Sequence, residues 1–454
     1  MMPTAGRSST RIPGPGTTAS LRLLNSFFDN PITFFTTLHE RWGDIVHVRA
    51  GSISMVCVYD LDALQRVLIA DAQAMRKGSG IRATRRVLGD GLFTSDGDTH
   101  RQDRRIAQPA FQPRNITAYA PTIIRHTDHT MATWSDGTEL NIHHAMIGTS
   151  LRIVAETILG AQLDEREIHN FAAATDSFNR AYRLMVSPGA NLIMRAPLPV
   201  VRRFNAGVRY VDELVGRLIA ECRSGKHPDR SDLLASMAAA TDEDGSRFSD
   251  LQLRDHAVTM LAAGHETVAA SLAWTCAVLA LNTPVQEQLA SEVDAVIGSA
   301  DPTADHMRDM PYLRAVVQEA MRLYPSVYSF VREPLASYEL LGHTITPGTD
   351  IAAPISAIHR DPRHYEQPLE FRPDRWLDTG GSSRHKLAYM PFGVGPRICI
   401  GSSYAMLEIM LVVARIMQQW TLTAPNPTQA LDPEAMFTMH PRSGPILTPV
   451  SRRA

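Results

Sequence analysis

A glycine- and proline-rich loop over residues 391–401 contains a single cysteine, Cys399, with no cysteine or histidine nearby in the sequence. Apolar residues then recur every three or four positions from Ala405 to Trp420, which is typical of an amphipathic helix. A helix N-terminus favours a thiolate. A lone thiolate does not suit structural zinc, but it suits one axial bond to an iron held by a macrocycle. For an isolated loop of this kind, a buried structural cysteine is the alternative interpretation.

The same loop has features that would accommodate a large flat ligand. Gly393, Gly395 and Gly401 lack side chains, so such a ligand can approach the backbone closely. Arg397 lies two residues before the cysteine and can reach a carboxylate on the ligand.

A second candidate site lies in a long apolar helix predicted over residues 249–282. Its segment 263–267, Ala-Gly-His-Glu-Thr, places an acid beside an alcohol. Gly264 would open the helix locally to a small ligand, and Glu266 with Thr267 could deliver the protons that cleavage of dioxygen requires. A solvated Glu266, with Thr267 hydrogen-bonded to the carbonyl four residues earlier, explains this segment equally well.

Two further pairs of charged residues have helical spacing. Glu319 and Arg322 lie three residues apart among apolar residues, which indicates a buried pair, although such pairs are common on exposed helices. His100 and Arg104 lie four residues apart and can both donate hydrogen bonds to carboxylates. For this second fragment alone, an ordinary basic helix surface is the simpler interpretation.

Together these segments resemble the cytochrome P-450 family. The cysteine loop is similar to the family's haem-binding signature, FxxGxRxCxG, from Phe392 to Gly401. Trp376 stands where the family more usually has phenylalanine, a departure that we expect to have no effect. The other segments that resemble family motifs, in the family's order, are residues 100–104, 263–267, 319–322 and 371–376.

The resemblance implies a mainly α fold with a smaller β-rich part, in which a triangular prism of helices surrounds a buried haem. It implies one domain over residues 21–454, after a disordered tail over residues 1–20. The expected cofactor is haem b (iron protoporphyrin IX), with Cys399 as the iron ligand. The resemblance extends the haem-binding set to His100, Arg104, Arg332, Phe392, Gly393, Arg397, Cys399 and Gly401.

The resemblance also assigns roles outside the haem-binding set. Glu266 and Thr267 are expected to manage protons. Glu319, Arg322 and Arg375 are expected to form a buried network that holds the cysteine loop. The residues expected to line the substrate pocket are Val87, Leu88, Leu261, Ala262, Gly264, Val327, Tyr328 and Phe437.

The implied function is a monooxygenase that inserts one oxygen atom of O2 into an unactivated C–H bond, by hydroxylation or epoxidation. The expected substrate is an apolar small molecule such as a terpenoid, polyketide, steroid or fatty acid. Electrons from NAD(P)H are expected to arrive through a separate ferredoxin and ferredoxin reductase. A ferredoxin could dock on a basic surface formed by Arg105, Arg114, Arg384 and Lys386, although charges scattered over a solvated surface explain these residues equally well.

Two other functions are compatible with a haem pocket. One is a non-catalytic haem sensor or carrier, and the other is an oxygen-independent isomerase or dehydratase on the same scaffold. The intact segment 263–267 argues against both.

Composition narrows the class of protein further. The chain has 454 residues, a net charge of −2 and 44% apolar residues, which is ordinary for a globular protein without a general affinity for nucleic acid. Its four cysteines are far apart, so no disulfide framework or zinc site is indicated. Because no window of about 18 apolar residues exists, we expect no transmembrane anchor and a cytoplasmic enzyme of bacterial type.

The elements that must position these residues can be predicted in outline. A helix is expected over residues 29–42, and another over 61–70 with Asp60 as its N-cap. Helices dominate from about 115 to 300, interrupted by an irregular apolar segment at 186–201. This segment is a substrate-access lid, a patch that dips into a membrane, or a plain buried loop. The remaining expected elements are strands at 44–50 and 53–59, a polar loop at 241–246, a helix at 311–324 and a β-rich stretch at 327–355.

Overall fold

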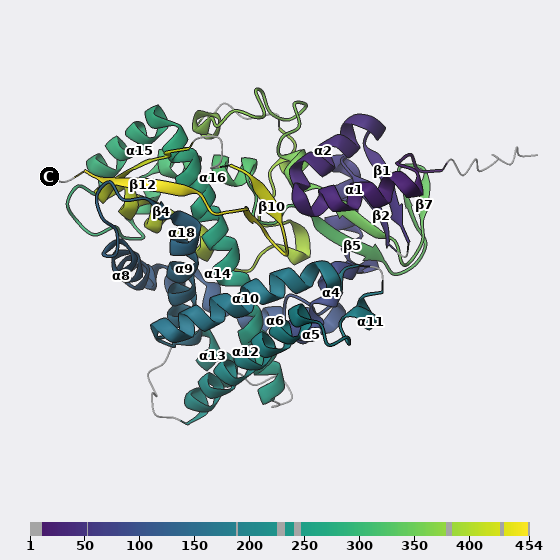
Figure 1. Ribbon diagram of the computed structural model, residues 1–454, viewed down its shortest axis with the longest axis horizontal. Helices are drawn as coiled ribbons and strands as arrows, with labels where there is room; N and C mark the ends of the chain where they lie inside the picture. The colour runs from purple at the N-terminus through teal and green to yellow at the C-terminus, as the bar shows by residue number, and fades with distance from the viewer. Residues whose placement is uncertain are drawn as a thin grey trace, which may run out of the picture.

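The computed structural model shows helices packed around one central helix, with a β-rich part at one end (Figure 1). This agrees with the mainly α fold that the sequence predicts. The structure describes residues 11–51, 53–187, 189–224, 232–239, 247–377, 384–426 and 431–452.

The central helix, α14 (Asp250–Leu281), crosses the middle of the molecule (Figure 1). It begins at Ser249, whose hydroxyl accepts a hydrogen bond from the Gln252 backbone N–H, while the Gln252 side chain accepts one from the Ser249 backbone N–H. Every residue from Val268 to Leu279 is buried, as expected for a core helix that is apolar all round. Helices packed on α14 include α9 (Ile142–Leu159), α16 (Pro311–Leu323) and α18 (Ser402–Gln419).

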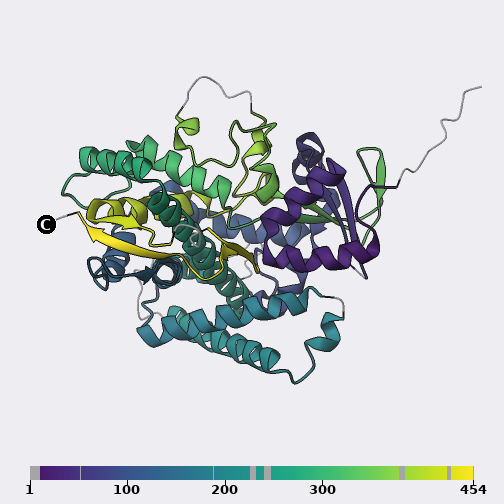
Figure 2. The same ribbon diagram turned by 45° about the horizontal axis from the view of Figure 1, so that its top comes forward.

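Two long helices lie side by side across one face of α14 (Figures 1 and 2). They are α10 (Glu165–Met185) and α12 (Pro199–Arg223), and the short helix α11 (Ala190–Ile193) lies in their connection. The exposed side chains of Leu192 and Leu198 lie in this connection, so the predicted irregular segment is in part an apolar surface loop.

The β-rich part is built on a five-stranded sheet of order β1-β2-β8-β5-β3. Helices α1 (Thr17–Asp29) and α2 (Pro31–Trp42) pack near its edge (Figure 1). In this sheet Lys77 pairs with Arg332, so both side chains lie on the same face. The strands are β1 (Ile45–Ala50), β2 (Ile53–Val58), β3 (Met75–Lys77), β5 (Phe330–Pro334) and β8 (Asp350–Ala353).

Smaller elements complete the fold. A β hairpin of β10 (Pro433–Ala435) and β11 (Met439–Pro441) reaches toward α14. The other helices are α3 (Leu61–Gln65), α4 (Ser79–Ala83), α5 (Arg85–Leu88), α6 (Gly97–Ala107), α7 (Pro113–Ala118), α8 (Ala120–Met131), α13 (Leu233–Ala239), α15 (Thr283–Val296) and α17 (Ile355–Ile358). The other strands are β4 (Leu140–Asn141), β6 (Tyr338–Leu340), β7 (His343–Ile345), β9 (Trp420–Thr423) and β12 (Ile446–Ser451).

Two predicted boundaries need correction. Helix α1 begins at Thr17, so the expected disordered tail does not extend through residue 20. The predicted helix over 61–70 is α-helical only to Gln65 and continues as a π-helical turn over residues 66–70, although Asp60 does cap it by accepting a hydrogen bond from the Ala63 backbone N–H. The predicted polar loop at 241–246 lies outside the described residues.

In the described part of the chain, no single helix is both long enough and apolar enough to cross a membrane. Helices α14 and α15 satisfy that length and composition test only when taken together, and the chain bends by 111° between them.

Candidate active site

The cysteine loop is closed on itself by a backbone hydrogen bond. The Cys399 N–H donates to the carbonyl oxygen of Phe392 at 2.8 Å, and helix α18 begins three residues later. Gly395 has a φ of +67°, and a side chain there would lie 2.6 Å from the backbone oxygen of Leu68. This hydrogen bond and the close contact with Leu68 therefore fix the position of the Cys399 sulfur. It lies just before the helix, as predicted.

The sulfur of Cys399 is accessible although the surrounding protein desolvates it. This desolvation raises the pKa of the thiol, while the backbone N–H of Gly401 and the charge of Arg104 partly oppose the rise. Arg104 also donates a hydrogen bond to the carbonyl oxygen of Ile398 at 2.7 Å. A bound metal cation would favour the thiolate, because it supplies the positive charge that the protein alone provides only in part.

A cluster of basic side chains lies beside the cysteine loop. Burial, followed by the positive charges of the other four members, lowers the pKa of His100 to about 3, so its ring is neutral near pH 7. Burial also lowers the pKa of Arg332 to about 10 and that of Lys77 well below its usual value. We call this set the basic cluster; its members are Lys77, His100, Arg104, Arg332 and Arg397.

The basic cluster has little negative charge of its own. Asp96 accepts a hydrogen bond from Arg397 at 2.7 Å and is the carboxylate that interacts most directly with the cluster. Like charges brought together in a buried place are costly unless an anion neutralises them. Haem carries two propionates, so the basic cluster and the accessible sulfur of Cys399 together fit this group.

Lys77 is the member of the basic cluster that the sequence did not suggest. Its side chain is 9% exposed, and its ammonium group lies over the Phe93 ring, 5.2 Å from the centroid. The pairing of β3 with β5 turns Lys77 toward the same face as Arg332. No local sequence signal marks that pairing, because the two strands lie far apart in the chain.

Two predicted haem contacts take up packing positions in the loop. Phe392 is partly buried against the helical core, and Gly393 lies beside the ring of Phe330, with a φ of +73°. A side chain at Gly401 would meet the ring of Phe111 at 3.6 Å and Sγ of Cys399 at 4.0 Å. The absence of a side chain at Gly401 therefore keeps one side of the sulfur clear.

The structure brings the predicted ionic network together. Glu319 and Arg322 are completely buried, and the guanidinium of Arg322 donates to both carboxylate oxygens of Glu319, at 2.9 and 2.8 Å. Arg375 donates to Oε1 at 2.9 Å. Burial works to raise the pKa of Glu319, but its bonds with Arg322, the Arg372 backbone N–H and Arg375 outweigh burial and lower it.

Trp376 takes part in this network, which the sequence did not suggest. Its indole Nε1–H donates to Oε2 of Glu319 at 2.8 Å, a hydrogen bond that phenylalanine could not make. Trp376 is therefore a further member of the buried network, and the guanidinium of Arg384 lies over its ring at 5.0 Å from the centroid.

Helix α14 passes the segment 263–267 without a break, so the predicted local opening of the helix does not occur. The Thr267 hydroxyl donates to the Ala263 carbonyl oxygen at 2.8 Å, as the second interpretation of this segment expects. Glu266 is not solvated, however: its side chain is buried, and Oε1 accepts hydrogen bonds from Asn179 at 2.6 Å and Thr438 at 3.0 Å.

Gly264 also serves a packing role that the sequence did not suggest. A side chain at this position would lie 2.7 Å from Val154 of α9, so the glycine permits close packing between two helices. The side-chain position thus faces a neighbouring helix rather than the cavity described next.

An apolar cavity lies between α14 and the helix pair α10 and α12. Four of the residues expected in the substrate pocket line it, namely Val87, Leu88, Ala262 and Phe437. Of the others, Leu261 is buried in the helical core, and Val327 and Tyr328 pack in the β-rich part. The lining residues that the sequence did not suggest are Phe171, Ala174, Thr175, Phe178, Phe204, Gly207, Val208, Val211, Val258 and Glu266.

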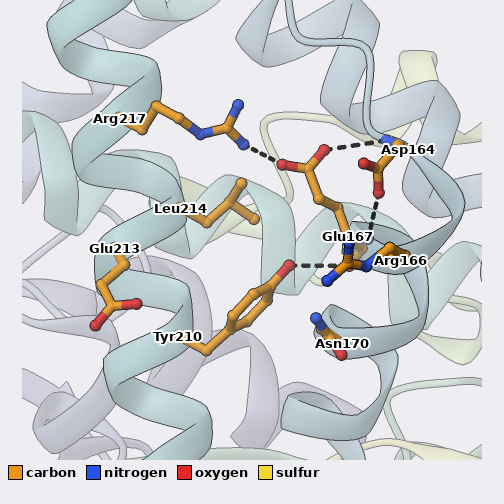
Figure 3. A pocket seen from close by; sticks show the side chains of 8 residues that line it. All are labelled: Asp164, Arg166, Glu167, Asn170, Tyr210, Glu213, Leu214 and Arg217. Atoms are coloured by element: carbon orange, nitrogen blue, oxygen red, sulfur yellow. Dashed lines mark hydrogen bonds and ion pairs between the residues drawn. The ribbon is translucent and has the colours of Figure 1, made fainter.

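A second pocket, between α10 and α12 toward the N-terminal end of α10, is polar (Figure 3). Glu167 connects its walls: its carboxylate bonds with Arg217 of α12, and its backbone oxygen accepts from the Tyr210 hydroxyl at 3.2 Å. Asp164 caps the start of α10 in the same place. These contacts hold the two helices together, and they make this pocket unsuited to an apolar ligand.

Comparison with known proteins agrees with this geometry. The model of the family described as Cytochrome P450 matches residues 13–447. Pentalenene oxygenase of Streptomyces avermitilis is 32% identical, with 91% of each chain covered. Cyclooctatin synthase of Streptomyces melanosporofaciens is 30% identical over 92% of this chain and 90% of the relative. Cyclooctat-9-en-7-ol 5-monooxygenase of the same organism is 30% identical over 90% and 88%.

Proposed function

This chain belongs to the cytochrome P450 family, and its relatives named above are oxygenases, which supports an oxidoreductase that incorporates oxygen into its substrate. We propose that it hydroxylates or epoxidises a terpenoid. The substrate class is supported by the relatives named for pentalenene and for cyclooctat-9-en-7-ol, and by the apolar walls of the cavity below α10 and α12. The observation that carries the proposal is the accessible sulfur of Cys399 beside the basic cluster.

Within this function, the cysteine loop and the basic cluster hold haem. Cys399 would bind the iron, and the basic cluster would bind the propionates. When bound, thiolate-ligated haem supplies the activation of O2 and the transfer of one oxygen atom to carbon. The network around Glu319 would position the loop through His359. Arg322 donates to the carbonyl oxygens of His359, Pro368 and Glu370, and the His359 ring nitrogen Nε2 accepts from the backbone N–H of Met390, directly before the loop, at 3.0 Å.

The polar residues of α14 would manage protons. Thr267 Oγ1 donates to the Ala263 carbonyl and keeps lone pairs that can accept a hydrogen bond, so it can hold a proton donor at this atom. Glu266 is the neighbouring acid, and Asn179 and Thr438 fix its orientation through Oε1. The apolar residues of the cavity exclude water from the substrate, which limits side reactions.

The thiolate assignment can be tested by absorption spectroscopy. Purified protein, reduced and exposed to carbon monoxide, should show the red-shifted absorption of a thiolate-ligated haem. The variant Cys399→Ser should lose that band, while Cys276→Ser, which changes a buried cysteine of α14, should keep it. Absence of the band from the wild-type protein would exclude this function.

The enzymatic assignment needs a separate measurement. With NADPH, a surrogate ferredoxin and its reductase, terpenes should stimulate consumption of O2 and yield products heavier by one oxygen atom. A haem sensor or carrier would give the carbon monoxide band without substrate-dependent O2 consumption. An isomerase or dehydratase would convert substrate without added electrons.

A further inference from the structure

Three polar side chains from three different elements meet beside the apolar cavity. Glu266 of α14 accepts hydrogen bonds from Asn179 of α10 and from Thr438, which lies between β10 and β11. Their exposures are 6%, 7% and 2%. Both bonds reach the same carboxylate oxygen, Oε1. We call these residues the acceptor cluster.

The acceptor cluster is not satisfied within the protein. Among the described residues, none donates a hydrogen bond to Oε2 of Glu266. The carbonyl oxygen of the Asn179 side chain, Oδ1, is buried without a hydrogen-bond partner in the same set of residues. A buried polar network that serves only the fold is expected to be fully paired, because each unpaired group costs about 1–3 kcal/mol.

The open oxygen belongs to a residue that lines the cavity. Among the described residues that line the cavity, Thr175 is the one polar side chain besides Glu266, and the others are apolar. A carboxylate oxygen in such a wall matches a ligand that is apolar over most of its surface and carries one hydrogen-bond donor.

We propose that the acceptor cluster recognises a hydroxyl group on the terpenoid substrate, with Oε2 of Glu266 as the acceptor. A hydroxyl suits this place better than an ammonium group, whose three donors would exceed the acceptors available in an apolar wall. The inference rests on the proposed function and deepens it, since it makes the substrate a terpene alcohol. A reaction that introduces the hydroxyl group must then precede this one.

Binding of three ligands with one skeleton tests the proposal. Cedrane, cedrol and cedryl methyl ether share a tricyclic sesquiterpene frame, and only cedrol can donate a hydrogen bond. Isothermal titration of the oxidised haem-loaded protein needs neither electrons nor O2. We expect cedrol to bind at least about tenfold more tightly than the other two, the factor that corresponds to one hydrogen bond of ordinary strength.

Variants of the cavity residues identify which side chain causes the preference for cedrol over cedrane. Glu266→Met should reduce the ratio of cedrol to cedrane affinity to about one, and Asn179→Leu should lower it several-fold by releasing the carboxylate. Glu266→Gln keeps a side-chain carbonyl and should retain part of the preference, which guards against a misfolded methionine variant. Thr175→Val, a change elsewhere on the same wall, should leave the ratio unchanged.

Several results would overturn the proposal. Equal binding of the three ligands by the wild-type protein would do so, as would a preference that survives in Glu266→Met or disappears in Thr175→Val. Binding of the ether as tightly as cedrol would show that donation is irrelevant. Failure of all three ligands to bind would also count against the proposal, because the cavity would then not accept a terpene skeleton of this kind. These outcomes are distinct from loss of the carbon monoxide band, which would refute the proposed function itself.

Discussion

The indole of Trp376 donates a hydrogen bond to Glu319 at 2.8 Å, in a place where that carboxylate is completely buried. Glu319 thereby accepts from two arginine side chains, one indole and the Arg372 backbone N–H. A carboxylate removed from water needs this many donors, because each oxygen can accept about two hydrogen bonds.

Replacement of Trp376 by phenylalanine should destabilise the protein. The change removes one donor from a buried charge, so we expect the free energy of unfolding to fall by about 1–3 kcal/mol. Denaturant unfolding monitored by circular dichroism measures it. Trp420→Phe is a matched control, since its buried indole nitrogen has no hydrogen-bond partner among the described residues and its loss should cost less. Equal effects of the two changes would contradict the assigned role.

Glu319→Ala should lose haem. Removal of one partner from a buried ionic network costs about 3–5 kcal/mol, and here it leaves Arg322 without its carboxylate in the core behind the cysteine loop. The ratio of haem absorption to protein concentration after purification measures the effect. Glu287→Ala, at an exposed position on α15, should keep full haem content. A fully loaded Glu319→Ala protein would refute the assignment.

Lys77→Met should speed the release of haem. The substitution preserves much of the apolar stem but removes one charge of the basic cluster, and a hydrogen bond to a charged group contributes about 1.5–3 kcal/mol. Transfer of haem to excess apomyoglobin should therefore become about 10- to 100-fold faster. Lys386→Met, on an exposed turn, should leave the rate unchanged. Equal rates for both variants would remove Lys77 from the haem site.

Glu408 should make stability depend on pH. This residue of α18 is completely buried. Desolvation raises the pKa of its carboxyl group to about 8. The Ser150 and Tyr404 hydroxyls lie beside the carboxyl group, but neither makes a well-aligned hydrogen bond to its oxygens. Because the pKa is higher in the folded than in the unfolded state, the stabilisation from the proton is complete below about pH 4.5 and is lost as pH rises to about 8.

Glu408→Gln tests this dependence. The amide has no charge to bury, so the variant should not lose stability as the pH rises. The free energy of unfolding of the variant minus that of the wild type should therefore increase between pH 5 and 8, by an amount on the order of a few kcal/mol, and then level off. Urea unfolding at several pH values measures this difference. A difference that stays constant with pH would mean that Glu408 titrates normally in the folded protein.

Local signals made much of this architecture predictable. Asp60 and Ser249 cap helices at the predicted positions because capping depends only on residues three apart. The cysteine loop and the pair Glu319–Arg322 are likewise short-range patterns. For these features the sequence neighbours are also the structural neighbours.

Contacts between distant segments were not predictable in the same way. The partners of Glu266 lie 87 and 172 residues away, so no local pattern distinguishes a solvated acid from one held by Asn179 and Thr438. The same holds for Gly264, whose lack of a side chain permits close packing against Val154, a residue 110 positions earlier in the chain. The contact of Trp376 with Glu319 was not predictable either, because this hydrogen bond joins residues 57 positions apart in the chain.

The pairing of Lys77 with Arg332 across β3 and β5 also bears on how the protein is made. Repulsion within the basic cluster opposes the pairing of these two strands, and the propionates of a bound haem would relieve it. Binding of the prosthetic group would then stabilise the folded chain. In cells starved of iron, newly synthesised chains should accumulate in a loosened form and be removed by proteases, so that the amount of this protein follows haem biosynthesis.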